Sequence, residues 1–209
     1  MNNKPVELYL IGGAAGFLSG VLMLISSYLI VMRLQAAGLG TPELKLLGVT
    51  HGLSVVSLIL IVPTVIALFV LLKTVVTARS YLGFGFATMW IVIEMVGHLA
   101  QTAPLRTLGE LHADHPTHAM AIYQVLGEYA EALLLTGTFF ATLTALCYGL
   151  SLVGGRNRLG GYIFLLAALA FPIGKWIPML GIQLHVVLRA LAFLIVSGVL
   201  IKIAAADED

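Results

Sequence analysis

Charged residues are scarce in this chain, and their scarcity limits what the protein can be. Asp, Glu, Lys and Arg make up 10% of the 209 residues, whereas 60% are hydrophobic and the mean hydropathy is +1.04. A soluble domain averages about 25% charged residues. The formal net charge of +1 supplies no field that would attract nucleic acid, and no basic stripe with interleaved aromatic residues is present. We therefore expect the lipid bilayer to be the solvent and exclude a nucleic-acid partner.

Cysteine is almost absent, since Cys147 is the single one and lies in an apolar run. No intrachain disulfide can form, and cysteine usage does not identify the redox compartment. The sequence also lacks a nucleophile elbow, a phosphate-cradling glycine loop and a dinucleotide fingerprint, because its glycines lie within or between apolar runs. No enzyme class follows from a local motif, and whether the protein is an enzyme stays open.

Long apolar runs are what the chain has in abundance. Each is long enough to cross a hydrocarbon layer about 30 Å thick, and none alternates as a barrel strand of about 9–11 residues would. We therefore predict an all-α, multi-pass bundle of six transmembrane helices in one domain, residues 1–209, with an outer His-rich loop at 102–119. The predicted spans are 8–32, 46–72, 81–101, 120–152, 160–178 and 182–203.

Basic residues between the spans predict the orientation, because they are retained preferentially on the cytoplasmic side. With the N-terminus inside, six basic residues fall in cytoplasmic segments: Lys4, Lys73, Arg79, Arg156, Arg158 and Lys202. Three fall in outer segments: Arg33, Lys45 and Arg106. We therefore expect both ends in the cytoplasm and the protein in the cell (inner) membrane.

Three glycines recur at four-residue intervals in the first span: Gly12, Gly16 and Gly20. Residues with this spacing share one helical face, and without side chains they let a neighbouring helix approach closely. We expect close helix packing there, with an oligomer contact through the same face as one option.

Ionisable side chains inside a bilayer are expensive, at about 2.5–3.5 kcal/mol each by insertion scales, so each asks for a partner or a role. Consecutive spans run antiparallel, so the start of an even span and the end of an odd span share one side of the membrane. By this parity eight ionisable groups within the spans fall in the outer half, whereas the inner halves are nearly free of charge. The eight are His51, Glu94, His98, Glu128, Glu131, Lys175, His185 and Arg189. Three pairs have the spacing of a shared helical face: Glu94 and His98, Glu128 and Glu131, His185 and Arg189.

A metal site is the interpretation that these residue types favour. His51, His98 and His185 with Glu94 form a suitable ligand set for zinc or iron. Glu128 or Glu131 would act as a base toward metal-bound water. Lys175 and Arg189 would hold an anionic group or balance the carboxylates. The function favoured is a metal-binding membrane protein, or a metalloenzyme acting on a lipid-soluble or periplasmic small molecule.

Two other functions remain open. A charged cavity open to one side would also suit an ion-coupled or proton-coupled transporter of a small solute. Two of the three histidines could hold a b-type haem that serves quinone chemistry. Some of the charged groups could instead only tie helices together as ion pairs.

The predicted outer loop raises a separate question, since His112, His115 and His118 recur there every three residues. A His-rich tract of this kind can recruit copper, zinc or nickel. The alternative is that these histidines are only solvated.

Overall fold

The structure is a computed structural model that describes residues 6–35, 41–154, 157–174 and 178–206, with side chains described for 6–29, 46–154, 157–172 and 184–206. These residues form helices almost throughout. The helices are α1 (Val6–Gln35), α2 (Thr41–Leu72), α3 (Thr77–Thr102), α4 (Leu105–Asp114), α5 (Pro116–Val153), α6 (Arg158–Gly174) and α7 (Pro178–Ala206). The all-α prediction is confirmed for the described residues, and each predicted span overlaps a helix.

Five helices are long and apolar enough to cross a membrane, with α3 running on into α4. This makes the chain a multi-pass membrane protein. The helix at the fifth predicted span, α6, is apolar but has only 17 residues. Its length of about 26 Å, at 1.5 Å per residue, is slightly less than a typical hydrocarbon core. The number of six spans and their orientation therefore remain predictions.

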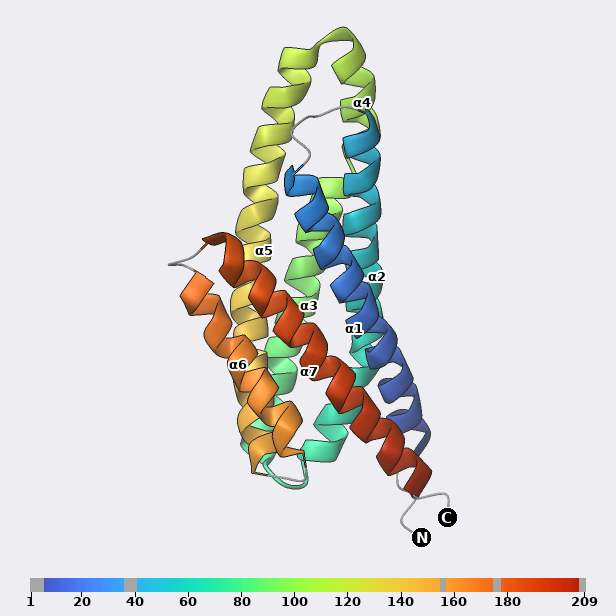
Figure 1. The fold of residues 1–209 in the computed structure, drawn as a ribbon, viewed down its shortest axis with the longest axis vertical. Coiled ribbons are helices and arrows are strands. Elements are labelled where there is room, and N and C mark those ends of the chain that lie inside the picture. The colour runs from blue at the N-terminus through green and yellow to red at the C-terminus, as the bar shows by residue number, and fades with distance from the viewer. Residues whose placement is uncertain (1–5, 36–40, 155–156, 175–177, 207–209) are drawn as a thin grey trace.

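The helices other than α4 form a closed ring in which each packs against two neighbours. The order around the ring is α1, α2, α3, α5, α6, α7 and back to α1. The start of α1 and the end of α7 lie at one end of the bundle, whereas α4 and the start of α5 extend from the other end (Figure 1). Side chains from non-adjacent helices can therefore meet only across the middle of the ring.

The connection at 102–119, which we expected to be an outer loop, is mostly helical. It contains α4 and the first turn of α5, separated by a break at His115. His115 has φ −139° and ψ 69°, outside the helical region that a following proline disfavours, and Pro116 then occupies the first turn of α5. One residue of α4, Leu108, is buried, so this helix lies mostly exposed.

The glycine face of α1 is packed between two helices of the same chain. A Cβ added at Gly12 would lie 2.6 Å from Cβ of Ala67 on α2, and one at Gly20 would lie 2.8 Å from Cγ of Leu194 on α7. The close packing predicted from the glycine spacing is therefore confirmed. Because α2 and α7 fill this face, no oligomer contact is needed to explain the glycines.

Candidate functional site

An ion pair crosses the middle of the ring between α3 and α7. Arg189 donates from Nη1 to Oε1 of Glu94 at 3.0 Å and from Nη2 to Oε2 at 3.3 Å. The two side chains are each 6% exposed. Removing two charges from water costs several kcal/mol per ion, and the two-pronged geometry offsets part of that cost. A pair of this kind is a weak source of stability, so its presence points to a further role.

Trp90 holds the guanidinium of Arg189 from a second direction. The guanidinium carbon lies 4.5 Å from the centroid of the indole, within the range of a cation–π contact. Trp90 and Glu94 are four residues apart on α3, so they present the same face to Arg189. Phe193, four residues after Arg189, stacks on the same indole with ring centroids 6.0 Å apart. The ion pair therefore rests on an aromatic layer of the core.

Two histidines form the second polar pair. The Nδ1 atoms of His51 on α2 and His98 on α3 are 2.8 Å apart, with ring centroids 5.1 Å apart. A bond between two ring nitrogens needs one donor and one acceptor, so the two imidazoles must carry their Nδ1 protons differently. His51 is buried and His98 half-buried. His98 lies one turn after Glu94, which brings the two polar pairs next to each other.

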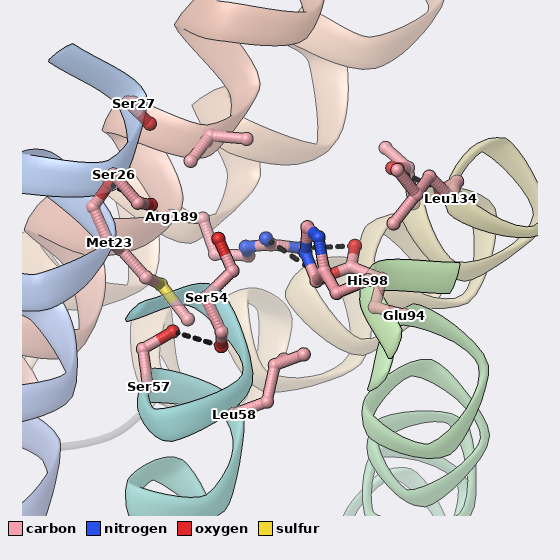
Figure 2. A pocket seen from close by; sticks show the side chains of 12 residues that line it. Met23, Ser26, Ser27, Ser54, Ser57, Leu58, Glu94, His98, Leu134 and Arg189 are labelled. Atoms are coloured by element: carbon pink, nitrogen blue, oxygen red, sulfur yellow. Dashed lines mark hydrogen bonds and ion pairs between the residues drawn. The ribbon is translucent and has the colours of Figure 1, made fainter. Parts of the chain in front are cut away.

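A cavity of about 140 Å³ lies beside the two polar pairs, and α1, α2, α3, α5 and α7 all contribute to its wall. Glu94, His98 and Arg189 face it (Figure 2). Around them stand five hydroxyl side chains: Ser26, Ser27, Ser54, Ser57 and Thr138. A water needs only about 10–15 Å³ measured in this way, so the space holds several waters or one small molecule.

Comparison with protein-family models, with curated proteins and with solved structures gave no match. The function must therefore be argued from the chemistry of the site.

Four of the residues singled out in the sequence meet here: His51, Glu94, His98 and Arg189. The structure places three of the others elsewhere. His185 is fully buried one turn before Arg189, with Nδ1 2.7 Å from the carbonyl oxygen of Ala167 on α6. Glu128 and Glu131 are exposed on α5 and do not line the cavity. Lys175 lies outside the described residues.

The predicted zinc or iron centre is not supported. Within the described parts of the chain, no three His, Cys, Asp or Glu side chains lie close enough to hold a metal ion. The physical reason is that the expected ligands have other partners. His51 and His98 bond to each other, and Glu94 receives both ends of the Arg189 guanidinium.

The histidines of the connection do not form such a group either. His112, His115 and His118 are exposed, and the rings of the last two lie edge to face with centroids 5.8 Å apart. Haem binding stays a prediction, and the rings of His51 and His98 are in direct contact with each other.

Several residues of the site were not singled out in the sequence. Trp90 is one of them, although it lies four residues before Glu94, as Glu94 lies four residues before His98. The face of α3 that carries the site therefore begins one turn earlier than its first charged group. Ser54 and Ser57 continue the face of His51 along α2. Gly137 on α5 leaves the room that Glu94 occupies, since an added Cβ would lie 2.5 Å from Cγ of Glu94.

Proposed function

We propose that this chain is a proton-coupled membrane transporter of a small polar solute, and that the Glu94–Arg189 cavity is its binding site. The observation that carries the proposal is the shared wall of the cavity. A buried ion pair and one member of a bonded histidine pair both line the same cavity. Ionisable groups held inside a membrane bundle mark solute, ion or proton pathways by default.

The histidine pair provides the means of coupling. In the neutral pair one Nδ1 donates to the other. A first proton, on Nε2 of the donor ring, leaves this bond in place, whereas a second proton, on the acceptor ring, puts hydrogen on both Nδ1 atoms and breaks the bond between the two rings. His98 would then turn or withdraw, and the wall of the cavity would change shape. Solute binding and proton binding would thus act on the same side chain.

The transporter would have six spans with both ends in the cytoplasm, as the basic residues predict. The start of α1 and the end of α7 lie at one end of the bundle, which supports an even number of crossings (Figure 1). Cysteine labelling in whole cells tests the orientation after Cys147→Ser. An impermeant maleimide should label Thr107→Cys directly and Thr77→Cys only after lysis, since both positions are exposed. The opposite pattern would reverse the orientation.

Transport is tested in proteoliposomes that contain a pH-sensitive dye. Small amino acids, amines, carboxylates and sugars are added outside in turn, and the internal pH is followed. We expect one class to move protons with the wild type and not with Glu94→Gln or His98→Gln. Glu128→Gln is the matched control, because Glu128 is an exposed carboxylate outside the cavity. The proposal fails if no class moves protons, or if the two cavity variants behave as the wild type does.

A further inference from the structure

The hydroxyl groups of the cavity are mostly hydrogen-bond acceptors. A hydroxyl has a single hydrogen and two lone pairs. In four of the five, that hydrogen is donated to a main-chain carbonyl three or four residues earlier: Ser26 to Met23, Ser54 to Thr50, Ser57 to Ser54 and Thr138 to Leu134. What these side chains offer to an occupant is therefore oxygen lone pairs. Such a wall suits a group that only donates, as a protonated amine does.

The charged residues add one acceptor and one donor. The Glu94 carboxylate has further lone pairs beyond the two that Arg189 uses. The Nε–H of Arg189 is buried and finds no hydrogen-bond partner in the parts of the chain that the structure describes. An unpaired buried donor is costly, and an anionic acceptor would relieve that cost. Glu94 and Arg189 both line the cavity, so its wall includes a carboxylate that suits an amine and a guanidinium that suits an acid.

We propose that the occupant is a small zwitterion, such as a short amino acid. This inference rests on the proposed function and names its substrate class. The amine would lie against Glu94 and the hydroxyl oxygens, and the carboxylate against Arg189. Adding a lone ion to the neutral Glu94–Arg189 pair would leave an uncompensated charge in a low-dielectric site. A zwitterion brings both charges together, so the filled site stays neutral.

The contact between Glu94 and Arg189 also sets the spacing of the ligand charges. The two side chains are within 3.0 Å of each other, so the groups that they bind must be close as well. A single carbon between amine and acid satisfies this, whereas a long chain does not.

Binding to the full-length protein in detergent tests the inference. Glycine and alanine are compared with methylamine, ethylamine, acetate and propionate, which carry one charge each, by thermal unfolding across a concentration series. We expect the amino acids to bind at least about tenfold more tightly than any single-charge compound, a gap of about 1.4 kcal/mol. Equal affinity for the amines or for the carboxylates would overturn the zwitterion, as would the absence of amino-acid binding.

Two threonines on α5 make a matched pair of variants. Thr138 lines the cavity and Thr136 is exposed, yet each donates to a carbonyl four residues earlier at 2.8 Å. Thr138→Val should weaken glycine binding about tenfold, and Thr136→Val should leave it unchanged. Both should fold, because the bond removed lies within one helix. Equal effects of the two variants would overturn the assignment of the hydroxyl oxygens.

The outcomes also separate this inference from the proposed function. If an uncharged solute moves protons in the proteoliposomes, the transport function is supported and the zwitterionic substrate is contradicted. If glycine or alanine binds with the expected selectivity but no solute moves protons, the binding site stands and the transport function falls.

Discussion

The guanidinium of Arg189 lies over the indole of Trp90, 4.5 Å from the ring centroid, while its Nη atoms reach Glu94 one turn further along the same helix. One face of the cation is thus covered by a π-system and one edge by a carboxylate. This arrangement holds a buried charge without water on those two sides. The Nε–H of Arg189 remains buried, with no hydrogen-bond partner among the described residues.

The contribution of the indole is measured by Trp90→Phe. The smaller ring attracts a cation less strongly, so we expect the free energy of unfolding to fall by about 0.5–2 kcal/mol beyond the loss of apolar area. A double-mutant cycle with Arg189→Met isolates the cation–π contact by SDS-induced unfolding. If the two substitutions have additive effects, the stacking contributes nothing.

The ion pair itself predicts a marked asymmetry between single and double variants. Arg189→Met alone leaves the Glu94 carboxylate buried and unpaired, which should lower the free energy of unfolding by about 3–5 kcal/mol. Glu94→Leu with Arg189→Met should recover most of this loss and still abolish ligand binding. The exposed pair Arg106 and Glu110 is the control, since Glu110→Gln should change stability by at most about 0.5 kcal/mol. A double variant as unstable as the single one would contradict the prediction.

Gly137 offers a test of the site that changes no polar group. A methyl group there would lie 2.5 Å from Cγ of Glu94, so Gly137→Ala should displace the carboxylate and weaken both stability and glycine binding. Gly127→Ala is the control on the same helix, because an added Cβ at Gly127 meets nothing within 4 Å. That substitution should stabilise the helix by about 0.5–1 kcal/mol. Similar effects of the two would show that Glu94 does not depend on Gly137.

The helices could be predicted from the sequence because apolar run length alone determines where a helix can lie within lipid. The predicted 120–152 became α5 at Pro116–Val153, and 46–72 became α2 at Thr41–Leu72. Parity of helix direction also brought His51 and His98 to one depth, and they are bonded in the structure. Depth, however, says nothing of rotation about the helix axis.

Rotation is why other members of the predicted centre are not in it. By parity of helix direction, Glu131 lies in the same half of the membrane as Glu94. It is nevertheless exposed, because α5 is rotated so that Gly137 and Thr138 face inward. His185 is turned toward Ala167 on α6. The cavity hydroxyls gave no signal in the sequence, since serine and threonine can satisfy themselves on their own helix and therefore occur throughout membrane helices.

Metal analysis of the purified protein tests the predicted zinc or iron centre, which the geometry does not support. Because the expected ligands already bond to other groups, we expect less than about one tenth of an equivalent of any transition metal, whereas a structural or catalytic site should be near-stoichiometric. A near-stoichiometric metal that His98→Ala removes would restore the metal centre. His118→Ala is the matched control, since His118 is an exposed histidine far along the chain from the cavity.

The His51–His98 bond predicts that the two rings are in different tautomers. One Nδ1 must carry a hydrogen and the other a lone pair. ¹⁵N spectra of histidine-labelled protein should therefore contain one protonated and one unprotonated Nδ1 resonance from this pair. His98→Gln should remove one of the two and shift the other. Acidification that protonates both rings should abolish the difference, because both Nδ1 atoms then carry hydrogen and the bond is broken. His112→Gln should leave both resonances unchanged, since His112 is exposed on α4. Two identical tautomers at neutral pH would mean that the rings do not share a hydrogen, and the proposed coupling of proton to solute would lose its mechanism.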